Sequence, residues 1–175
     1  MLGVFKCVPE AIVPSYATKF SACFDLHSCI PAGTVVKAII PTEVTYRGSS
    51  TEDTCTLVSD ENGCLIIPPR ARVLIPTGLK FNIPLHCSIR LHPRSGLSFK
   101  NGLILANCEG VIDEDYVDQV FIILHNISNV SATIKHGDRV CQAELVRDSR
   151  EPVKEILQEP QKKTDRSGGF GSTGV

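Results

Sequence analysis

Residues 86–92 read His-Cys-Ser-Ile-Arg-Leu-His, and the alternation in this stretch decides the fold class. Cys87, Ile89 and Leu91 fall on one face, and the polar residues fall on the other. Because successive side chains of a β-strand point to opposite faces of its sheet, this pattern predicts a half-buried strand. Residues 119–124 are apolar on both faces and are predicted to form a central strand.

Strand-like composition recurs at residues 34–40 and 72–75, and prolines and glycines separate the segments. Short strands between turn signals indicate an all-β barrel or sandwich. One short helix is predicted after Pro93, in which Ser95 caps residues 96–101 and Gly102 ends the helix.

Residues 150–166 are polar and contain two prolines, which is typical of a linker. The predicted organisation is therefore one β domain, residues 1–150, followed by a linker and C-terminal segment, residues 151–175.

The composition is that of a single soluble globular domain. Of the 175 residues, 42% are apolar and 21% are charged, and the net charge is −1. A general nucleic-acid binder needs an excess of Lys and Arg, so no nucleic-acid partner is expected. No apolar run approaches the roughly 20 residues that span a bilayer, so no membrane contact is expected. The first residues lack the pattern of a secretory signal, so a cytoplasmic location is expected.

Eight cysteines are present, and none forms a Cys-x-x-Cys pair. Several lie in apolar stretches, so we interpret them as reduced core or near-core residues, with a disulfide framework as the alternative. His86 and His92 fall on one strand face with no cysteine pair beside them. No zinc site is therefore expected, and surface or subunit-contact roles are expected for both histidines.

The first stretch that could take part in binding or catalysis is Pro-Arg-Ser-Gly-Leu at residues 93–97. Ser95 and the backbone N–H groups that follow it would open the short helix, and such an end attracts anions. Arg94 could add a bidentate phosphate contact. The alternative is a capped turn that carries a surface arginine.

The second stretch is Asn-Cys-Glu-Gly-Val-Ile-Asp-Glu-Asp-Tyr at residues 107–116, which is predicted to form a tight hairpin. Because Val111 and Ile112 are apolar, Asp113 is expected where a strand meets a dry pocket. A partly desolvated carboxylate there could act as a general base toward water, and Tyr116 could present its flat face to a sugar. The alternative is a solvated acidic turn.

The third stretch is Gly-Asp-Arg-Val-Cys-Gln at residues 137–142, a turn that enters a strand and places Gln142 on its polar face. The fourth is the tail Arg-Ser-Gly-Gly-Phe-Gly-Ser-Thr-Gly at residues 166–174. Phe170 offers a stacking surface and Arg166 a phosphate clamp, and glycines let a backbone approach a ligand closely. The tail is interpreted as a mobile lid, with a disordered chain end as the alternative.

These stretches, together with Ala-Cys-Phe-Asp-Leu at residues 22–26, appear in the order of the five motifs of the trimeric dUTPase family, which the chain resembles. The resemblance implies a jelly-roll-like β fold and a homotrimer whose active sites are shared between subunits. It also implies hydrolysis of dUTP to dUMP and pyrophosphate, with Mg²⁺ bound to the triphosphate.

The resemblance also implies roles for single residues. Asp113 would activate the water that attacks the α-phosphorus. Asn107 would read the uracil edge together with the backbone of Gly110 and Val111, and Tyr116 would lie under the deoxyribose. The implied phosphate contacts are Arg94, which is mostly structural, Ser95, Gly96 and Gln142.

Asp25 would support the water shell of the metal or the structure of the site. In the tail, Phe170 would stack on uracil and Arg166 would clamp the γ-phosphate. Beside them, Ser172 and Thr173 would bind the phosphates, and Gly171 is a further implied substrate contact.

The chain departs from the family pattern at four places. Cys23 and Asp118 stand where glycines are usual, and one residue is missing between Arg166 and Gly168. The stretch between the first two motifs is also longer. The surplus is predicted near residues 42–67, as a β-hairpin arm of 54–58 and 64–67 around a turn at 59–63. A partner-binding arm and a neutral surface insertion both stay open.

Two other functions compete with dUTP hydrolysis. A dCTP deaminase shares the fold but needs a glutamate-centred site and lacks this tail. A nucleotide-binding regulatory protein would act through the inserted arm.

Overall fold

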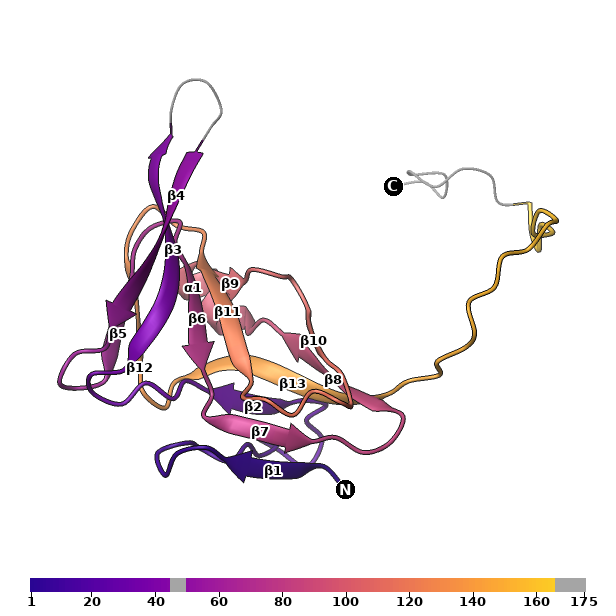
Figure 1. Ribbon diagram of the computed structural model, residues 1–175, viewed down its shortest axis with the longest axis horizontal. Helices are drawn as coiled ribbons and strands as arrows, with labels where there is room; N and C mark the ends of the chain where they lie inside the picture. Colours follow the sequence, from indigo (N-terminus) through magenta and orange to yellow (C-terminus); the bar gives the residue numbers. More distant parts are fainter. Residues whose placement is uncertain (45–49, 166–175) are drawn as a thin grey trace.

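The computed structural model describes residues 1–44 and 50–165, which form β-strands and one short helix (Figure 1). The elements, in chain order, are β1 (Gly3–Lys6), β2 (Phe24–His27), β3 (Val35–Val44), β4 (Ser50–Val58), β5 (Cys64–Ile67), β6 (Arg72–Pro76), β7 (Leu79–Asn82), β8 (Cys87–His92), α1 (Ser95–Asn101), β9 (Leu103–Leu105), β10 (Gly110–Ile112), β11 (Phe121–Asn126), β12 (Ala132–Lys135) and β13 (Arg139–Arg147). The predicted all-β class with one short helix is confirmed.

Two sheets make up most of the fold. One has the strand order β10-β8-β13-β2 and the other the order β4-β3-β6-β11-β9, and β1-β7 and β12-β5 form two-stranded ribbons. All the strand pairs are antiparallel. The core is apolar: Leu26 and Ile89 from the first sheet and Ile75 and Ile122 from the second have no exposed surface. Burying each such side chain contributes roughly 1.5–3 kcal/mol.

The strand that decided the fold class is β8, and its apolar face is buried as predicted. It begins at Cys87, because His86 adopts a positive φ of 61° and its N–H donates to Glu114. On the opposite face Arg90 and His92 are partly exposed, as a half-buried strand requires, and the prediction is wrong only at Ser88. Ser88 is 1% exposed because the segment after β13 crosses it, and its Oγ donates to Asp148 Oδ1 at 2.9 Å.

The apolar segment at 119–124 forms β11, which lies between β6 and β9 and is therefore internal, as predicted. Burial nevertheless alternates along it. Ile122 and Leu124 are buried, whereas Phe121 is 40% and Ile123 38% exposed. One face of this strand is thus apolar but uncovered within the single chain, and such faces mark contact surfaces.

The helix α1 ends at Gly102, which has the left-handed φ of 64° expected of a terminal glycine. The predicted Ser95 cap is wrong. Arg94 occupies the cap position without a side-chain cap hydrogen bond, and Ser98 Oγ donates to the Arg94 carbonyl at 3.0 Å. No helix within residues 1–44 and 50–165 is long and apolar enough to cross a membrane.

A β-hairpin projects from the body, as Figure 1 shows, and the predicted strand 54–58 is part of it, but the partner of that strand is not the predicted one. β3 pairs with β4 from Val35↔Val58 to Val44↔Ser50, and residues 45–49 join them. The predicted pairing of 54–58 with 64–67 is wrong, because β5 pairs with β12 instead. This pairing buries Leu65 and Ile67 beside Ile134 in the core, which a projecting arm could not do.

All eight cysteines are free. Cys29, Cys87 and Cys141 are buried, and Cys108 is exposed in contrast to the expected near-core position. Burial raises the pKa of the Cys141 thiol to about 12.

Gly78 and Gly33 test how tightly the body is packed. Both have a positive φ, but a Cβ on Gly78 would lie 2.7 Å from Ala11 Cβ, whereas nothing lies within 4 Å of one on Gly33. We expect Gly33→Ala to cost about 1 kcal/mol through backbone strain alone and Gly78→Ala to cost about 1–3 kcal/mol more through overpacking. Urea unfolding of both variants measures the difference, and equal losses would contradict the close packing.

Candidate functional site

A pocket opens where the chain changes sheets twice. β9 belongs to the five-stranded sheet, β10 pairs with β8 in the other sheet, and β11 returns to pair with β9. The space between these strands has a volume of about 360 Å³, which is within the usual range of small-molecule sites. We call it the apolar pocket; its lining residues are Leu74, Leu91, Leu105, Asn107, Gly110, Val111, Ile112, Asp113, Tyr116, Val120, Phe121, Ile122 and Ile123.

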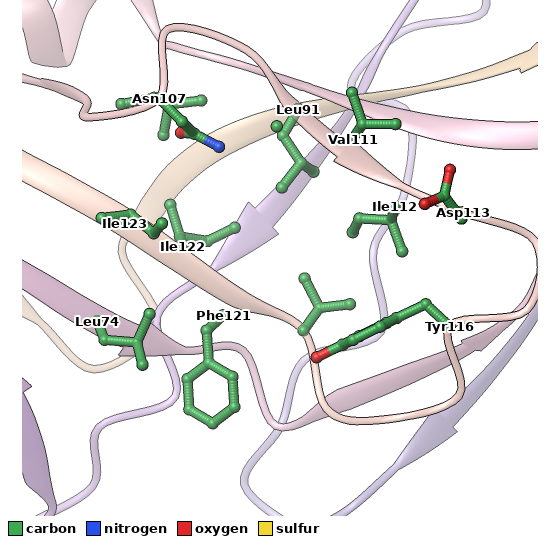
Figure 2. Close-up of a pocket in the computed structure, with 13 residues that line it drawn as sticks. Leu74, Leu91, Asn107, Val111, Ile112, Asp113, Tyr116, Phe121, Ile122 and Ile123 are labelled. Carbon is green, nitrogen blue, oxygen red and sulfur yellow. The ribbon is translucent and has the colours of Figure 1, made fainter.

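Asn107 lies in the turn between β9 and β10, and its amide is at one end of the pocket (Figure 2). The turn is anchored on β11, because the Ala106 N–H donates to the Ile123 carbonyl at 2.9 Å. Cys108 follows with a positive φ of 60°, and its N–H donates back to Leu105. A side-chain amide is thus held by backbone bonds at the mouth of an apolar slot.

Gly110 lets β10 approach β8 closely. A Cβ at this position would lie 2.9 Å from Leu91 Cδ1, so any side chain would displace the pocket wall. Gly110 is buried, and Val111 is 48% exposed beside it.

Asp113 and Tyr116 lie at the other end of the pocket, where β10 ends (Figure 2). The Tyr116 N–H donates to the Asp113 carbonyl at 3.1 Å, and the Tyr116 hydroxyl donates to the Gln119 carbonyl at 3.0 Å. The predicted tight hairpin is wrong, because residues 107–116 form two turns with β10 between them. Asp113 is also exposed, so the expected desolvation of its carboxylate is not present in the single chain.

Asp113 also borders a second, polar pocket of about 510 Å³ that is formed with Arg90 and residues 146–150. Arg90 Nη2 lies 3.5 Å from Asp148 Oδ1 there. Asp113 thus stands between an apolar space and a water-accessible polar one.

Asp25 organises a separate group at the other end of β8. Its carboxylate is buried, with Arg94 Nε 3.1 Å from Oδ1 and Arg139 Nη1 3.2 Å from Oδ2. The Asp25–Arg94 contact lacks hydrogen-bond geometry, and Arg94 instead donates from Nη1 to the Arg139 carbonyl at 2.9 Å. Arg94 is therefore held in place from two sides, by the Asp25 carboxylate and by the Arg139 carbonyl.

The other predicted phosphate contacts gather around this group. Ser95 and Gly96 begin α1, directly after Arg94, and the space beside Gly96 is open. Gln142 on β13 stands opposite both His92 and Asp25 in the sheet register.

The two groups of predicted residues do not meet within one chain. The pairing Ile112↔Ile89 places Asp113 one residue further, level with Ser88. Arg94 lies six residues beyond Ser88, which corresponds to about 20 Å along an extended strand. The structure therefore brings together Asn107, Gly110, Val111, Asp113 and Tyr116, and separately Asp25, Arg94, Ser95, Gly96 and Gln142.

Sequence reasoning missed the walls of the apolar pocket, which come from Leu74 on β6 and from residues 120–123. The apolar character of both faces of 119–124 was the available signal. The predicted tail residues lie outside the described residues; they are Arg166, Phe170, Gly171, Ser172 and Thr173.

Sequence comparisons connect this geometry with known proteins. Residues 56–174 match the dUTPase family model. The chain is 35% identical over 174 residues to the deoxyuridine 5'-triphosphate nucleotidohydrolase of Nautilia profundicola, covering 99% of this chain and 98% of that protein. It is 33% identical over 164 residues to that of Caulobacter vibrioides, covering 93% and 86%.

Solved structures share the fold. The dUTPase of Staphylococcus bacteriophage 80alpha with dUPNHPP is similar with a TM-score of 0.73 at 19% identity, covering 100% of this chain and 99% of that chain. A variant of the phage phi11 dUTPase of S. aureus, described with a structural Mg(II) ion, has a TM-score of 0.67 at 17% identity over 92% and 99%. The jelly-roll-like fold expected from the sequence is thus confirmed.

Proposed function

The chain belongs to the dUTPase family, a family of hydrolases, and we propose that it converts dUTP and water into dUMP and pyrophosphate in the cytoplasm. The observation that carries this proposal is the apolar pocket, which holds an amide at one end and a carboxylate and an aromatic ring at the other. The arrangement suits a nucleoside with a polar base edge and a flat, apolar sugar face.

Asn107 is proposed to recognise the base. Uracil and cytosine differ in their donor and acceptor pattern at one edge, and a slot built to hydrogen-bond one pattern leaves polar groups unpaired with the other. Gly110 and Val111 line the same pocket, and their backbone groups are proposed to complete the recognition of the base edge. Tyr116 would pack against the deoxyribose, where the ring leaves no room for a 2′-hydroxyl.

Asp113 is proposed as the general base. Its carboxylate would take a proton from a water molecule as the water oxygen bonds to the α-phosphorus. The bond from that phosphorus to the bridging oxygen breaks, and pyrophosphate leaves with the electron pair. The exposure of Asp113 beside the polar pocket supports access of water to this carboxylate. A segment that closed over the site would exclude the remaining bulk water and thereby strengthen the electrostatic interactions of catalysis.

Mg²⁺ is proposed to bind mainly to the triphosphate, where it would neutralise charge as the α-phosphorus reacts. Both Asp25 oxygens face guanidinium groups at 3.1 and 3.2 Å, so this carboxylate does not fit a direct ligand of the ion. An indirect role through water, or the positioning of Arg94, fits its surroundings.

The phosphate contacts are proposed to come from a neighbouring subunit of a homotrimer. Within one chain, Asp113 and Ser95 lie at opposite ends of β8, too far apart for one triphosphate to touch both. The uncovered apolar face of β11 continues into a groove formed with β3 and β6, which supports a subunit contact there. Phe170, Arg166 and the hydroxyls after them are proposed to complete the site as a lid.

The hairpin of β3 and β4 is proposed to lie outside the chemistry, because none of its residues lines the apolar pocket within the described chain.

A substrate panel tests the proposed reaction. We expect pyrophosphate release from dUTP, with dCTP turned over roughly 10⁴-fold more slowly because the base slot would leave polar groups unpaired. UTP and dTTP are the companion substrates. Ammonia release from dCTP would instead identify a deaminase, and binding without turnover of dUTP would favour the regulatory alternative.

Removing the proton acceptor tests Asp113. We expect Asp113→Asn to lower kcat for dUTP by about 10²-fold or more, as loss of a general base does, with little change in dUTP affinity. Asp115→Asn, which removes a neighbouring exposed carboxylate, is the matched control and should keep the parental rate. A near-parental kcat for Asp113→Asn would remove this residue from the proposed role.

Mixed assemblies test the shared site. Asp113→Asn and Gln142→Ala are each expected to remove most of the activity when present alone. If a site takes Asp113 from one chain and Gln142 from another, random 1:1 assembly leaves about a quarter of the sites intact and restores about a quarter of the activity. A site contained in one chain restores none, so the activity after co-refolding of the two variants distinguishes the two arrangements.

A further inference from the structure

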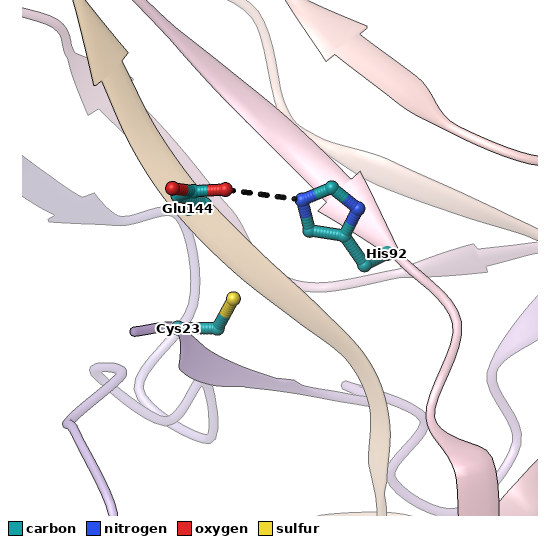
Figure 3. A group of neighbouring side chains, drawn as sticks. All are labelled: Cys23, His92 and Glu144. Atoms are coloured by element: carbon teal, nitrogen blue, oxygen red, sulfur yellow. Dashed lines mark ion pairs between the residues drawn. The ribbon is translucent and has the colours of Figure 1, made fainter. Parts of the chain in front are cut away.

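Three side chains with metal-binding atoms converge on one face of the four-stranded sheet, as Figure 3 shows. Gln142 stands opposite His92 on one side and Asp25 on the other. Two residues further along the strand, Glu144 projects from the same face, level with Cys23, which precedes β2. One ligand atom from each of Cys23, His92 and Glu144 lies within 4.8 Å of the others.

The distances resemble those between ligands of one ion. His92 Nε2 and Glu144 Oε2 are 3.5 Å apart, long for a hydrogen bond. Two atoms bound to a tetrahedral Zn²⁺ at about 2.0–2.2 Å lie about 3.3–3.6 Å from each other. The Cys23 Sγ would need to approach by roughly 1 Å, which a small side-chain rotation provides.

A fourth residue lies beside the imidazole. Glu109 Oε1 lies 3.6 Å from His92 Nδ1, on the side of the ring away from Glu144. Histidines that bind a metal through one nitrogen commonly present the other to a carboxylate, which fixes the tautomer and the ring orientation. Each nitrogen of His92 thus lies near a carboxylate, one available as a second ligand and one as a partner that could orient the ring.

We propose that Cys23, His92 and Glu144 form a Zn²⁺ site, distinct from the magnesium of the proposed reaction. A thiolate, an imidazole and a carboxylate form a donor set typical of Zn²⁺, whereas Mg²⁺ prefers oxygen ligands alone. Three protein ligands leave a fourth position for water. All three side chains are partly exposed, so the ion can enter from solvent.

Two carboxylates, those of Glu144 and Asp25, lie close enough to the Cys23 thiol to act on it electrostatically. A bound Zn²⁺ would offset their negative charges, and the thiol proton would pass to solvent. The site does not depend on the proposed hydrolysis, so the two can fail separately.

Cobalt titration tests the site, because Co²⁺ takes the place of Zn²⁺ and reports its ligands by absorption. We expect the untagged, metal-free full chain to bind one Co²⁺ with tetrahedral visible bands and a thiolate-to-metal charge-transfer band. Excess Zn²⁺ should remove both bands, and excess Mg²⁺ should leave them. Absence of the charge-transfer band would overturn the proposal.

Matched variants assign the ligands. Cys23→Ser should abolish the charge-transfer band, while Cys7→Ser, which removes a thiol outside the cluster, should keep it. Glu144→Gln preserves shape and should weaken Zn²⁺ binding at least about tenfold, and Glu109→Gln should weaken it by about tenfold through the ring orientation. Circular dichroism confirms that each variant is folded. A band that survives in Cys23→Ser, or unchanged affinity in Glu144→Gln, would show that the cluster is only a polar surface contact.

Discussion

The site depends on a single pairing constraint: three residues, Gly110–Ile112, pair with β8 in one sheet, while the strands before and after them pair with each other in the other sheet. The chain must therefore cross between sheets twice within a few residues. The two crossings carry Asn107 and Asp113, and the space between the sheets becomes the pocket. Gly110 is what permits the approach, because the Leu91 side chain occupies the room that a Cβ would need.

The buried core and the charged group around Asp25 contribute differently to the free energy of folding. Fully buried leucines and isoleucines contribute roughly 1.5–3 kcal/mol each and hold the two sheets together. The Asp25–Arg139 ion pair is worth less, since Arg139 is half exposed and exposed pairs contribute about 1 kcal/mol or less. The effect of the two Asp25 contacts is on position: Arg94, which caps α1, and Arg139, which begins β13, are fixed beside each other. The core provides stability, and the charged group provides alignment.

The same geometry links assembly with activity. One strand, β8, carries the proposed catalytic end of the site near Ser88 and the proposed phosphate end near Arg94, and its length keeps them apart. In the proposed homotrimer, a nucleotide would meet both where two chains adjoin. The apolar residues Phe121 and Ile123, exposed in the single chain, offer the kind of surface that such a contact would cover. In this proposal, a monomer is an incomplete enzyme.

The sequence by itself determined the all-β class, the buried face of β8, the internal place of β11 and the glycine that ends α1. These follow from local periodicity and backbone preference, which act over a few residues. It also determined the family, because the motifs recur in order. Only the tertiary structure decided that β5 pairs with β12, that Ser88 is buried and that Asp113 is exposed, since each depends on a segment distant in sequence. The convergence of Cys23, His92 and Glu144 is of the same kind: sheet register, which no local pattern contains, brings residues from three separate segments to one point.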